Sequence, residues 1–200
     1  MEKYELTSET LQYAGHTLHR IKALRDFGTI YAGELGGWIE KEENLSQVGN
    51  AWVYGDSMVY DNAIVSDNAW VYCNAKVYDN ANVCGNAIIR DHARVFGNVL
   101  VSDNADIFNH AIICGYVEVR GNAEIRNAKV YDNKDYIVFK NFWSSGRYFT
   151  WTRSNNKWCA GCFYGTGEEL IKKAYADSEK SGREYERVVR YVESILADEK

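Results

Sequence analysis

The sequence contains no proline and only two methionines among its 200 residues. Because proline lacks a backbone N–H and interrupts ladders of hydrogen bonds, its absence favours a chain whose backbone is paired along most of its length. The sequence also lacks any apolar run near the roughly 18 residues of a membrane-spanning helix, and Met1 does not begin an export signal. We therefore expect a soluble, cytoplasmic protein without a membrane partner.

Basic residues and cysteines are both sparse. The chain carries 23 Lys and Arg against 28 Asp and Glu, for a net charge of -5. This balance argues against a protein that coats nucleic acid, although it leaves room for a local basic patch. The cysteines are odd in number and most occupy repeat positions where other residues also occur, which favours a reducing compartment over a disulfide framework. They are Cys73, Cys84, Cys114, Cys159 and Cys162.

What the sequence has in abundance is one short pattern, repeated every six residues from Ala51 to Ile125. A small residue is followed two positions later by Val or Ile, and then by a pair such as Asp-Asn or Gly-Asn. Since alternate residues of a strand share a face, each unit predicts a very short strand with two inward side chains, followed by a turn. After Ile125 the pattern loses one residue, because Ala128 and Val130 repeat it one step early.

Six-residue repeats of this kind indicate a parallel β-helix. Three units make one triangular coil, and the coils stack at about 4.8 Å. One unit cannot bury its own face, so stability comes from stacked neighbours. We predict a mainly β fold in which residues 48–133 form a single-stranded left-handed parallel β-helix. Residues 1–47 would form an N-terminal β cap with a degenerate first coil, because an uncovered coil exposes an unpaired strand edge.

The segment before the repeats contains Gly36-Gly37-Trp38 and then Asn44-Leu45-Ser46. This run resembles the YdcK-like hexapeptide-repeat proteins, and the similarity extends from about Tyr4 to Tyr131. The resemblance implies a left-handed β-helix and a homotrimer. Members of the family are often labelled acyltransferases by analogy of fold, and similar chains are common in phages and gut bacteria. The present chain would be of that phage or gut-bacterial type, with an extra small C-terminal domain.

Bulky aromatic residues are not spread evenly over the three faces of the predicted coils. They fall into two columns, on the first and second faces. Stacked aromatics stabilise a ladder by about 0.5–1.5 kcal/mol per pair, which is one explanation. The other is a contact surface, for self-association (a trimer before a dimer) or for a foreign partner such as a host protein. The expected interface residues are Trp52, Tyr54, Tyr60, Trp70, Tyr72 and Tyr78.

His92 and His110 occupy the same corner in successive coils, so their rings are expected to lie about one strand spacing apart. In an acyltransferase of this fold, one of them would be the general base. Both also occupy a position that Asn holds at other corners ("RDHARV" against "SDNAWV"), which favours a structural role. A metal site needs more ligands than this pair supplies, and His16 and His19 have no partner that the pattern can place. We predict no metal.

After Asn133 the repeats stop. Three strand-like runs, "DYIVFKNF", "GRYFTWTR" and "KWCAGCFY", are followed by two helical segments. Ser or Thr with Glu three residues later predicts a capped helix start at Thr166 and again at Ser181. We predict a small α+β domain of three strands and two helices over residues 134–200, which caps the last coil.

Aromatic and basic residues are interleaved in these strand-like runs. Such a sheet can bind nucleotides or other small anionic ligands by stacking and charge. Alternatively, half of the aromatics are buried under the helices and the basic residues line a solvent face. The Cys159–Cys162 pair lies inside a strand and predicts packing, not redox chemistry. The candidate ligand-binding residues are Trp143, Arg147, Tyr148, Trp151, Arg153 and Trp158.

Three functions compete at this point. The first is a non-enzymatic oligomeric binding protein without a cofactor, which in a phage would sequester a host factor or a small anionic ligand in the host cytoplasm. The second is an acyltransferase that uses acetyl-CoA or another acyl-CoA, with His92 or His110 as base. Against it, the repeats have no long inserted loop and no basic cluster for the CoA phosphates. The third is single-stranded nucleic-acid binding by the C-terminal sheet. We favour the first and do not expect a nucleic-acid partner.

Overall fold

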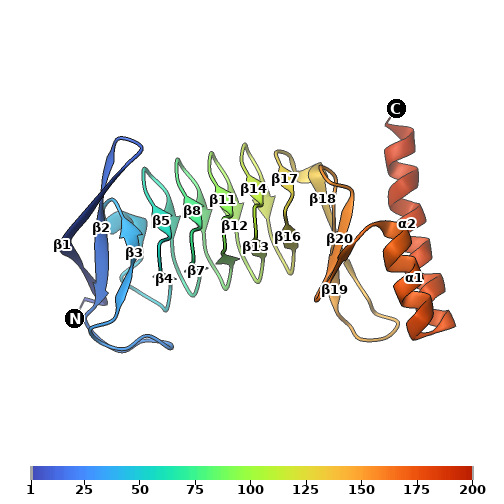
Figure 1. Ribbon diagram of the computed structural model, residues 1–200, viewed down its shortest axis with the longest axis horizontal. Helices are drawn as coiled ribbons and strands as arrows, with labels where there is room; N and C mark the ends of the chain where they lie inside the picture. Colours follow the sequence, from blue (N-terminus) through green and yellow to red (C-terminus); the bar gives the residue numbers. More distant parts are fainter. Residues whose placement is uncertain (1, 200) are drawn as a thin grey trace.

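The repeat folds into two- and three-residue strands that stack coil upon coil along a rod. The computed structural model describes residues 2–199. A β-hairpin lies at one end of the rod, the coils follow, and a small sheet with two helices lies at the other end (Figure 1). None of the described helices is long and apolar enough to cross a membrane.

The coils form three parallel sheets, which we call face one, face two and face three. Face one consists of β4 (Trp52–Val53), β7 (Trp70–Val71), β10 (Ile88–Ile89), β13 (Asp106–Phe108) and β16 (Glu124–Arg126). Face two contains β5 (Met58–Val59), β8 (Lys76–Val77), β11 (Arg94–Val95), β14 (Ile112–Ile113) and β17 (Lys129–Val130). Face three consists of β6 (Ile64–Val65), β9 (Asn82–Val83), β12 (Leu100–Val101) and β15 (Glu118–Val119). The predicted parallel β-helix of three-sided coils is confirmed.

The repeated residues supply the core and the corners. The small residue and the Val or Ile of each unit are buried in one continuous cluster. The Asp of several turns adopts a positive φ, for example 58° at Asp67 and 57° at Asp79. Its carboxylate accepts a hydrogen bond from the amide one coil onward, as Asp79 does from Gly97 at 3.1 Å. Asp is therefore favoured at the corner because it tolerates this backbone and also links the coils.

The register follows the sequence pattern to its end. β13 pairs with β16 through Asp106 and Glu124, whereas β14 pairs with β17 through Ile112 and Lys129. The last coil is thus one residue shorter than the one before it. The loss of one residue after Ile125 is confirmed.

The N-terminal cap extends face two beyond the first coil. β1 (Tyr4–Tyr13) and β2 (His16–Ala23) form an antiparallel hairpin, and β3 (Leu35–Ile39) pairs with both β2 and β5. Gly36 and Gly37 are required there because a Cβ at Gly36 would lie 2.7 Å from Trp52 and one at Gly37 would lie 2.8 Å from the Ser57 carbonyl oxygen. A short 3-10 turn, η1 (Glu42–Asn44), leads into the coils.

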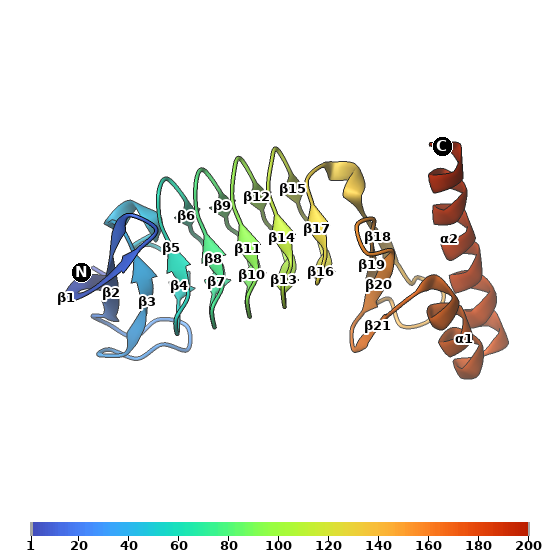
Figure 2. The same ribbon diagram turned by 45° about the horizontal axis from the view of Figure 1, so that its top comes forward.

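The C-terminal part is an antiparallel sheet with two helices, which lie side by side beyond it (Figure 2). A 3-10 turn, η2 (Asn133–Asp135), precedes β18 (Tyr136–Lys140), β19 (Tyr148–Thr152), β20 (Lys157–Ala160) and β21 (Phe163–Gly165), and α1 (Gly167–Asp177) and α2 (Glu179–Asp198) follow. The prediction of three strands is corrected to four, because a turn at Gly161, with φ of 59°, divides the last strand-like run.

The two predicted helix starts have different outcomes. The capping box of α1 is confirmed, since the Glu169 amide donates to Thr166 Oγ1 at 3.2 Å and the Thr166 amide donates to Glu169 Oε2 at 2.7 Å. The predicted start of the second helix at Ser181 is wrong. Ser178 is the N-cap of α2, and its hydroxyl accepts from the Ser181 amide at 3.1 Å.

The C-terminal sheet covers the last coil. The Glu124 amide donates to Thr150 Oγ1 at 2.9 Å, and the Tyr136 hydroxyl donates to the Glu118 carbonyl at 2.8 Å. Tyr136 and Val138 also pack against the core of the coils. The domain boundaries at residues 47 and 133 remain predictions.

Candidate functional site

The aromatic column of face one is covered at its N-terminal end. Trp52 is 0% exposed, and the rings of Tyr4 and Phe27 lie edge-on to its indole at 6.2 and 5.2 Å. The prediction that Trp52 belongs to an exposed interface is therefore wrong. The first coil would otherwise expose its open end, and the cap uses this indole as its anchor.

The aromatic column of face two is covered in the same way. Tyr60 is 6% exposed beneath Tyr13 and His16 of the β1–β2 hairpin, so its predicted interface role is also wrong. Tyr78 is half-buried and stacks on Tyr60 at 5.0 Å and on Phe96 at 4.7 Å. This second column stabilises the rod and anchors the hairpin.

What remains open is a shallow apolar depression of about 410 Å³ on face one, which we call the aromatic depression. Its lining residues are Tyr54, Trp70, Tyr72 and Ile88. Tyr54 is 46% exposed, whereas the other three are half-buried. Burial raises the pKa of the Tyr72 hydroxyl above its ordinary value. Three of the six predicted interface residues thus lie together on an accessible surface.

The C-terminal side of the same column is filled by charged contacts. The Arg90 guanidinium lies 4.1 Å from the Phe108 ring centre and binds the Asp106 carboxylate with two hydrogen bonds of 2.8 and 3.0 Å. Arg126 then lies over Tyr164 of the C-terminal sheet at 4.7 Å. These contacts mark the edge of the aromatic depression, because the aromatic groups beyond it already have partners.

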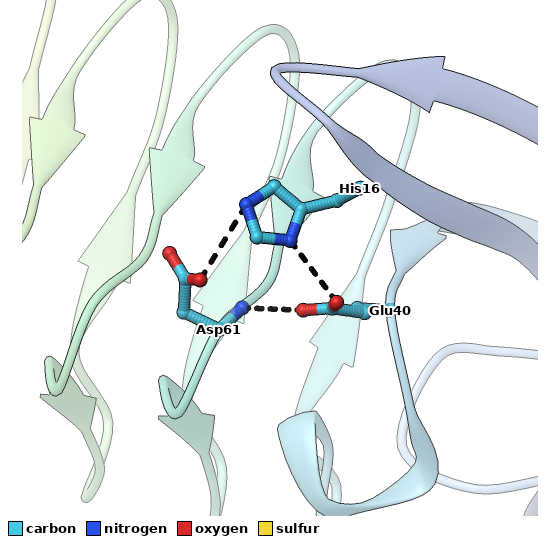
Figure 3. A group of neighbouring side chains, drawn as sticks. All are labelled: His16, Glu40 and Asp61. Carbon is cyan, nitrogen blue, oxygen red and sulfur yellow. Dashed lines mark hydrogen bonds and ion pairs between the residues drawn. The ribbon is translucent and has the colours of Figure 1, made fainter.

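A cluster that the sequence did not reveal lies where the hairpin meets face two. His16, at the start of β2, is placed between Glu40 and Asp61 (Figure 3). Its Nδ1 lies 3.0 Å from Glu40 Oε1, and its Nε2 lies 3.5 Å from Asp61 Oδ1. The Asp61 amide also donates to Glu40 Oε2 at 2.7 Å. No local pattern connects these three residues, because only docking of the hairpin brings them together.

The His16 cluster is electrostatically self-consistent. The hydrogen bond to Glu40 raises the pKa of His16, and the Asp61 charge adds to this effect. Burial works to raise the pKa of Glu40, but the bonds from His16 and from the Asp61 amide lower it overall. Histidine and two carboxylates are also ligands that a metal such as Zn²⁺ accepts. The carboxylates face opposite ring nitrogens, however, so this arrangement suits a bridging imidazolium and not a single bound ion.

His92 and His110 stack as expected, with ring centres 5.0 Å apart and planes within 4°. Both side chains are exposed beside a depression of about 440 Å³ at their corner. A general base needs a partner that orients its ring. Within residues 2–199, no side chain or backbone group forms a hydrogen bond to either imidazole ring. Their catalytic role therefore remains a prediction.

Two of the predicted ligand-binding aromatics are core residues. Trp151 is 1% exposed and Trp158 is 2% exposed, so the prediction that they stack on a ligand is wrong. They pack in the cluster between the sheet and the helices. The strand alternation places them on the helix-covered face, which is the alternative that the sequence left open.

The other predicted ligand-binding residues divide between partnered and free side chains. Trp143 is half-buried and edge-on to Tyr185 at 5.1 Å. Arg153 binds Glu199 at 2.6 Å and lies 3.6 Å from Asp135. Tyr148 is half-buried beneath the Lys140 ammonium, which lies 5.3 Å from its ring centre. Arg147 alone among the six is exposed at a pocket.

Comparison with known proteins agrees with the architecture. Residues 58–72 match the family model described as YdcK Beta solenoid repeat. A stretch of 75 residues is 33% identical to the Escherichia coli (strain K12) protein named Uncharacterized acetyltransferase YdcK. This match covers 33% of the present chain and only 23% of that relative. The chain is thus similar to YdcK-like β-solenoid repeat proteins in its coils.

Proposed function

We propose that this protein is a non-catalytic binding protein that self-associates through the aromatic depression on face one. The supporting observation is that Tyr54, Trp70 and Tyr72 remain accessible while the cap and the C-terminal sheet cover both ends of the same face. Tyr and Trp are the residues that most often anchor protein contacts. The resemblance to homotrimeric β-helix proteins favours a trimer over a dimer.

The state of the histidines supports a role without catalysis. His16 has carboxylates at both ring nitrogens, so neither nitrogen is free to take a proton from a substrate. His92 and His110 are free but have no orienting group among the described residues. A contact function requires neither feature.

Self-association is tested by sedimentation velocity and light scattering across a concentration series. The full chain is expected at a multiple of its 22.9 kDa mass, and Trp70→Ala is expected at the monomer mass. Ile64→Ala is the matched control, since Ile64 is an exposed apolar residue of face three at 44% exposure. A wild-type chain that stays monomeric at all concentrations contradicts the proposal, as does equal dissociation by both variants.

An acyl-CoA-dependent acyltransferase is the second candidate. It is favoured by the accessible His92–His110 stack beside its depression and by the name of the E. coli relative. Titration calorimetry with acetyl-CoA, followed by turnover with a panel of amines and sugars, tests it. Saturable binding and turnover that are lost in both His92→Ala and His110→Ala would support it, and no heat of binding would exclude acetyl-CoA as a substrate.

The phage setting and the sequestration of a host factor rest on the family resemblance alone. Both stay predictions. If the aromatic depression is filled by a foreign protein and not by a second copy, the purified chain will be monomeric by itself.

A further inference from the structure

A pocket of about 210 Å³ lies where the β18–β19 connection meets the junction of α1 and α2. Its buried lining residues include the apolar Leu170 and Ala174 together with the polar Asn141 and Ser181. Its exposed residues are polar and include Ser145, Arg147 and Lys173. The pocket is separate from the aromatic depression, which lies on the coils.

Arg147 differs from the other arginines of this part of the chain. Arg153 is bound to Glu199, and the three arginines of α2 each have a glutamate within 3.6 Å. In the described residues 134–199, Arg147 is the arginine whose guanidinium has no acidic partner. Its guanidinium instead lies beside the backbone turn at Gly161. Arginine binds carboxylate and phosphate oxygens strongly, so an unpaired one beside a pocket points to an anion.

The hydroxyl groups around the pocket can also act as donors to a ligand. The Asn141 side-chain amide donates its two hydrogens to Ser144 Oγ at 2.9 Å and to the Tyr185 hydroxyl at 3.0 Å. Ser145 Oγ accepts a bond from the Arg147 amide at 3.3 Å. Because the Tyr185 and Ser145 hydroxyl oxygens already accept hydrogen bonds, their own hydrogens are available to a further acceptor. No acceptor for them lies within hydrogen-bond distance in residues 2–199, and the same holds for the Ser181 hydroxyl.

Two further charges surround the pocket. Lys173 lines it and has no acidic partner within the described part of the chain, whereas Asp177 is the one carboxylate among the lining residues. Ser181 lies in the first turn of α2, a 20-residue helix whose N-terminal end carries partial positive charge. The C-terminal end of α1, at Asp177, carries the opposite partial charge and offsets this helix end. The two cations and the three free hydroxyl hydrogens still outweigh the single carboxylate.

We infer that this pocket binds a small organic anion, a carboxylate or a phosphate monoester, through Arg147 and Ser145. A short apolar part of the ligand packs against Phe163 and Leu170, which form the apolar side of the pocket. The anionic oxygens replace water at Arg147 and accept the free hydroxyl hydrogens. This inference is independent of the self-association proposed above, and Trp70→Ala leaves the pocket intact.

The test is an NMR titration of the ¹⁵N-labelled full chain with inorganic phosphate and, separately, with n-butyrate. Saturable shifts are expected at the amides of residues 144–147 and 181–182. Arg147→Gln is expected to weaken binding about tenfold or more, because it removes a charge-assisted hydrogen bond. Arg153→Gln is the matched control and is expected to bind like the wild type, since Arg153 is already paired with Glu199.

The two probes also separate the two sources of an anionic group. A response to phosphate alone assigns a phosphate monoester, and a response to butyrate alone assigns a carboxylate. No saturable shift with either probe overturns the inference, as do equal losses in Arg147→Gln and Arg153→Gln. The melting temperature of Arg147→Gln shows whether it is folded, and Lys173→Gln provides a second variant at another side of the pocket.

Discussion

Replacement of His16 tests the link between the hairpin and face two. His16 contacts Glu40 and Asp61 through opposite ring nitrogens (Figure 3). The three side chains are 26%, 28% and 30% exposed, so solvent partly screens both ion pairs. Each pair is worth about 0.5–1 kcal/mol under these conditions. We expect His16→Gln to lower the free energy of unfolding by about 1–2 kcal/mol at pH values at which the His16 imidazole is protonated.

The pH dependence follows from the directions of the two pKa shifts. The folded state raises the pKa of His16 above its ordinary value of 6.5, so its contribution is complete below 6.5 and is lost as pH rises through the raised value. The folded state lowers the pKa of Glu40 below 4.5, so its contribution is complete above 4.5 and is lost as pH falls through the lowered value. The His16 cluster is therefore strongest between pH 4.5 and 6.5.

The assay is urea unfolding of wild type and His16→Gln at about pH 5.5 and about pH 8.5, with NMR titration of the imidazole resonances. The difference between the two proteins should be largest at the lower pH and should shrink at the higher one. His19→Gln is the matched control, because His19 lies on the same strand and its ring has no acidic partner in residues 2–199, only a hydrogen-bond contact of 3.4 Å with the Thr7 carbonyl. The reasoning is refuted if His16 titrates at or below pH 6.5, or if the loss is equal at both pH values.

Three further substitutions address packing, and urea unfolding measures each. Trp52→Ala should cost about 3–5 kcal/mol because it leaves a cavity under the cap. Trp52→Phe should cost clearly less, because the smaller ring still fills most of that cavity and the lost indole N–H has no partner; equal losses would contradict this. Gly37→Ala should destabilise the first coil by about 1–3 kcal/mol because of the Ser57 carbonyl, and an unchanged midpoint would contradict the close approach. Arg90→Lys should cost about 1 kcal/mol through the loss of its two bonds to Asp106 and its contact with Phe108, and no loss would show that this contact is only incidental.

The periodic part of the fold could be predicted from the sequence because it depends on local spacing. The two-residue spacing between Ala51 and Val53 determines which side chains point inward, and the six-residue period determines where the next corner falls. Even the shorter last coil was visible at Ala128. Neighbouring coils repeat the same contacts, so one correct assignment determines all the others.

The covering of the ends could not be predicted in the same way. Trp52 and Trp70 occupy equivalent positions of successive coils, yet one is buried by the cap and the other is half-exposed. The difference arises from Tyr4 and Phe27, which reach Trp52 only through the path of the N-terminal chain. The contact of His16 with Glu40 has the same origin. Long-range docking of non-repeating segments leaves no period in the sequence.

The contrast between repeating coils and non-repeating end segments also explains which surfaces are left for function. A solenoid must cover both of its ends, because an open coil exposes unpaired strand edges. Here the cap covers the first coil and the C-terminal sheet covers the last one, so the aromatic residues near the ends are used for folding. Trp70 and Tyr72 lie between these covers, and no end-covering requirement accounts for their exposed area. A contact function therefore fits best on the middle coils of face one, between the N-terminal cap and the C-terminal sheet.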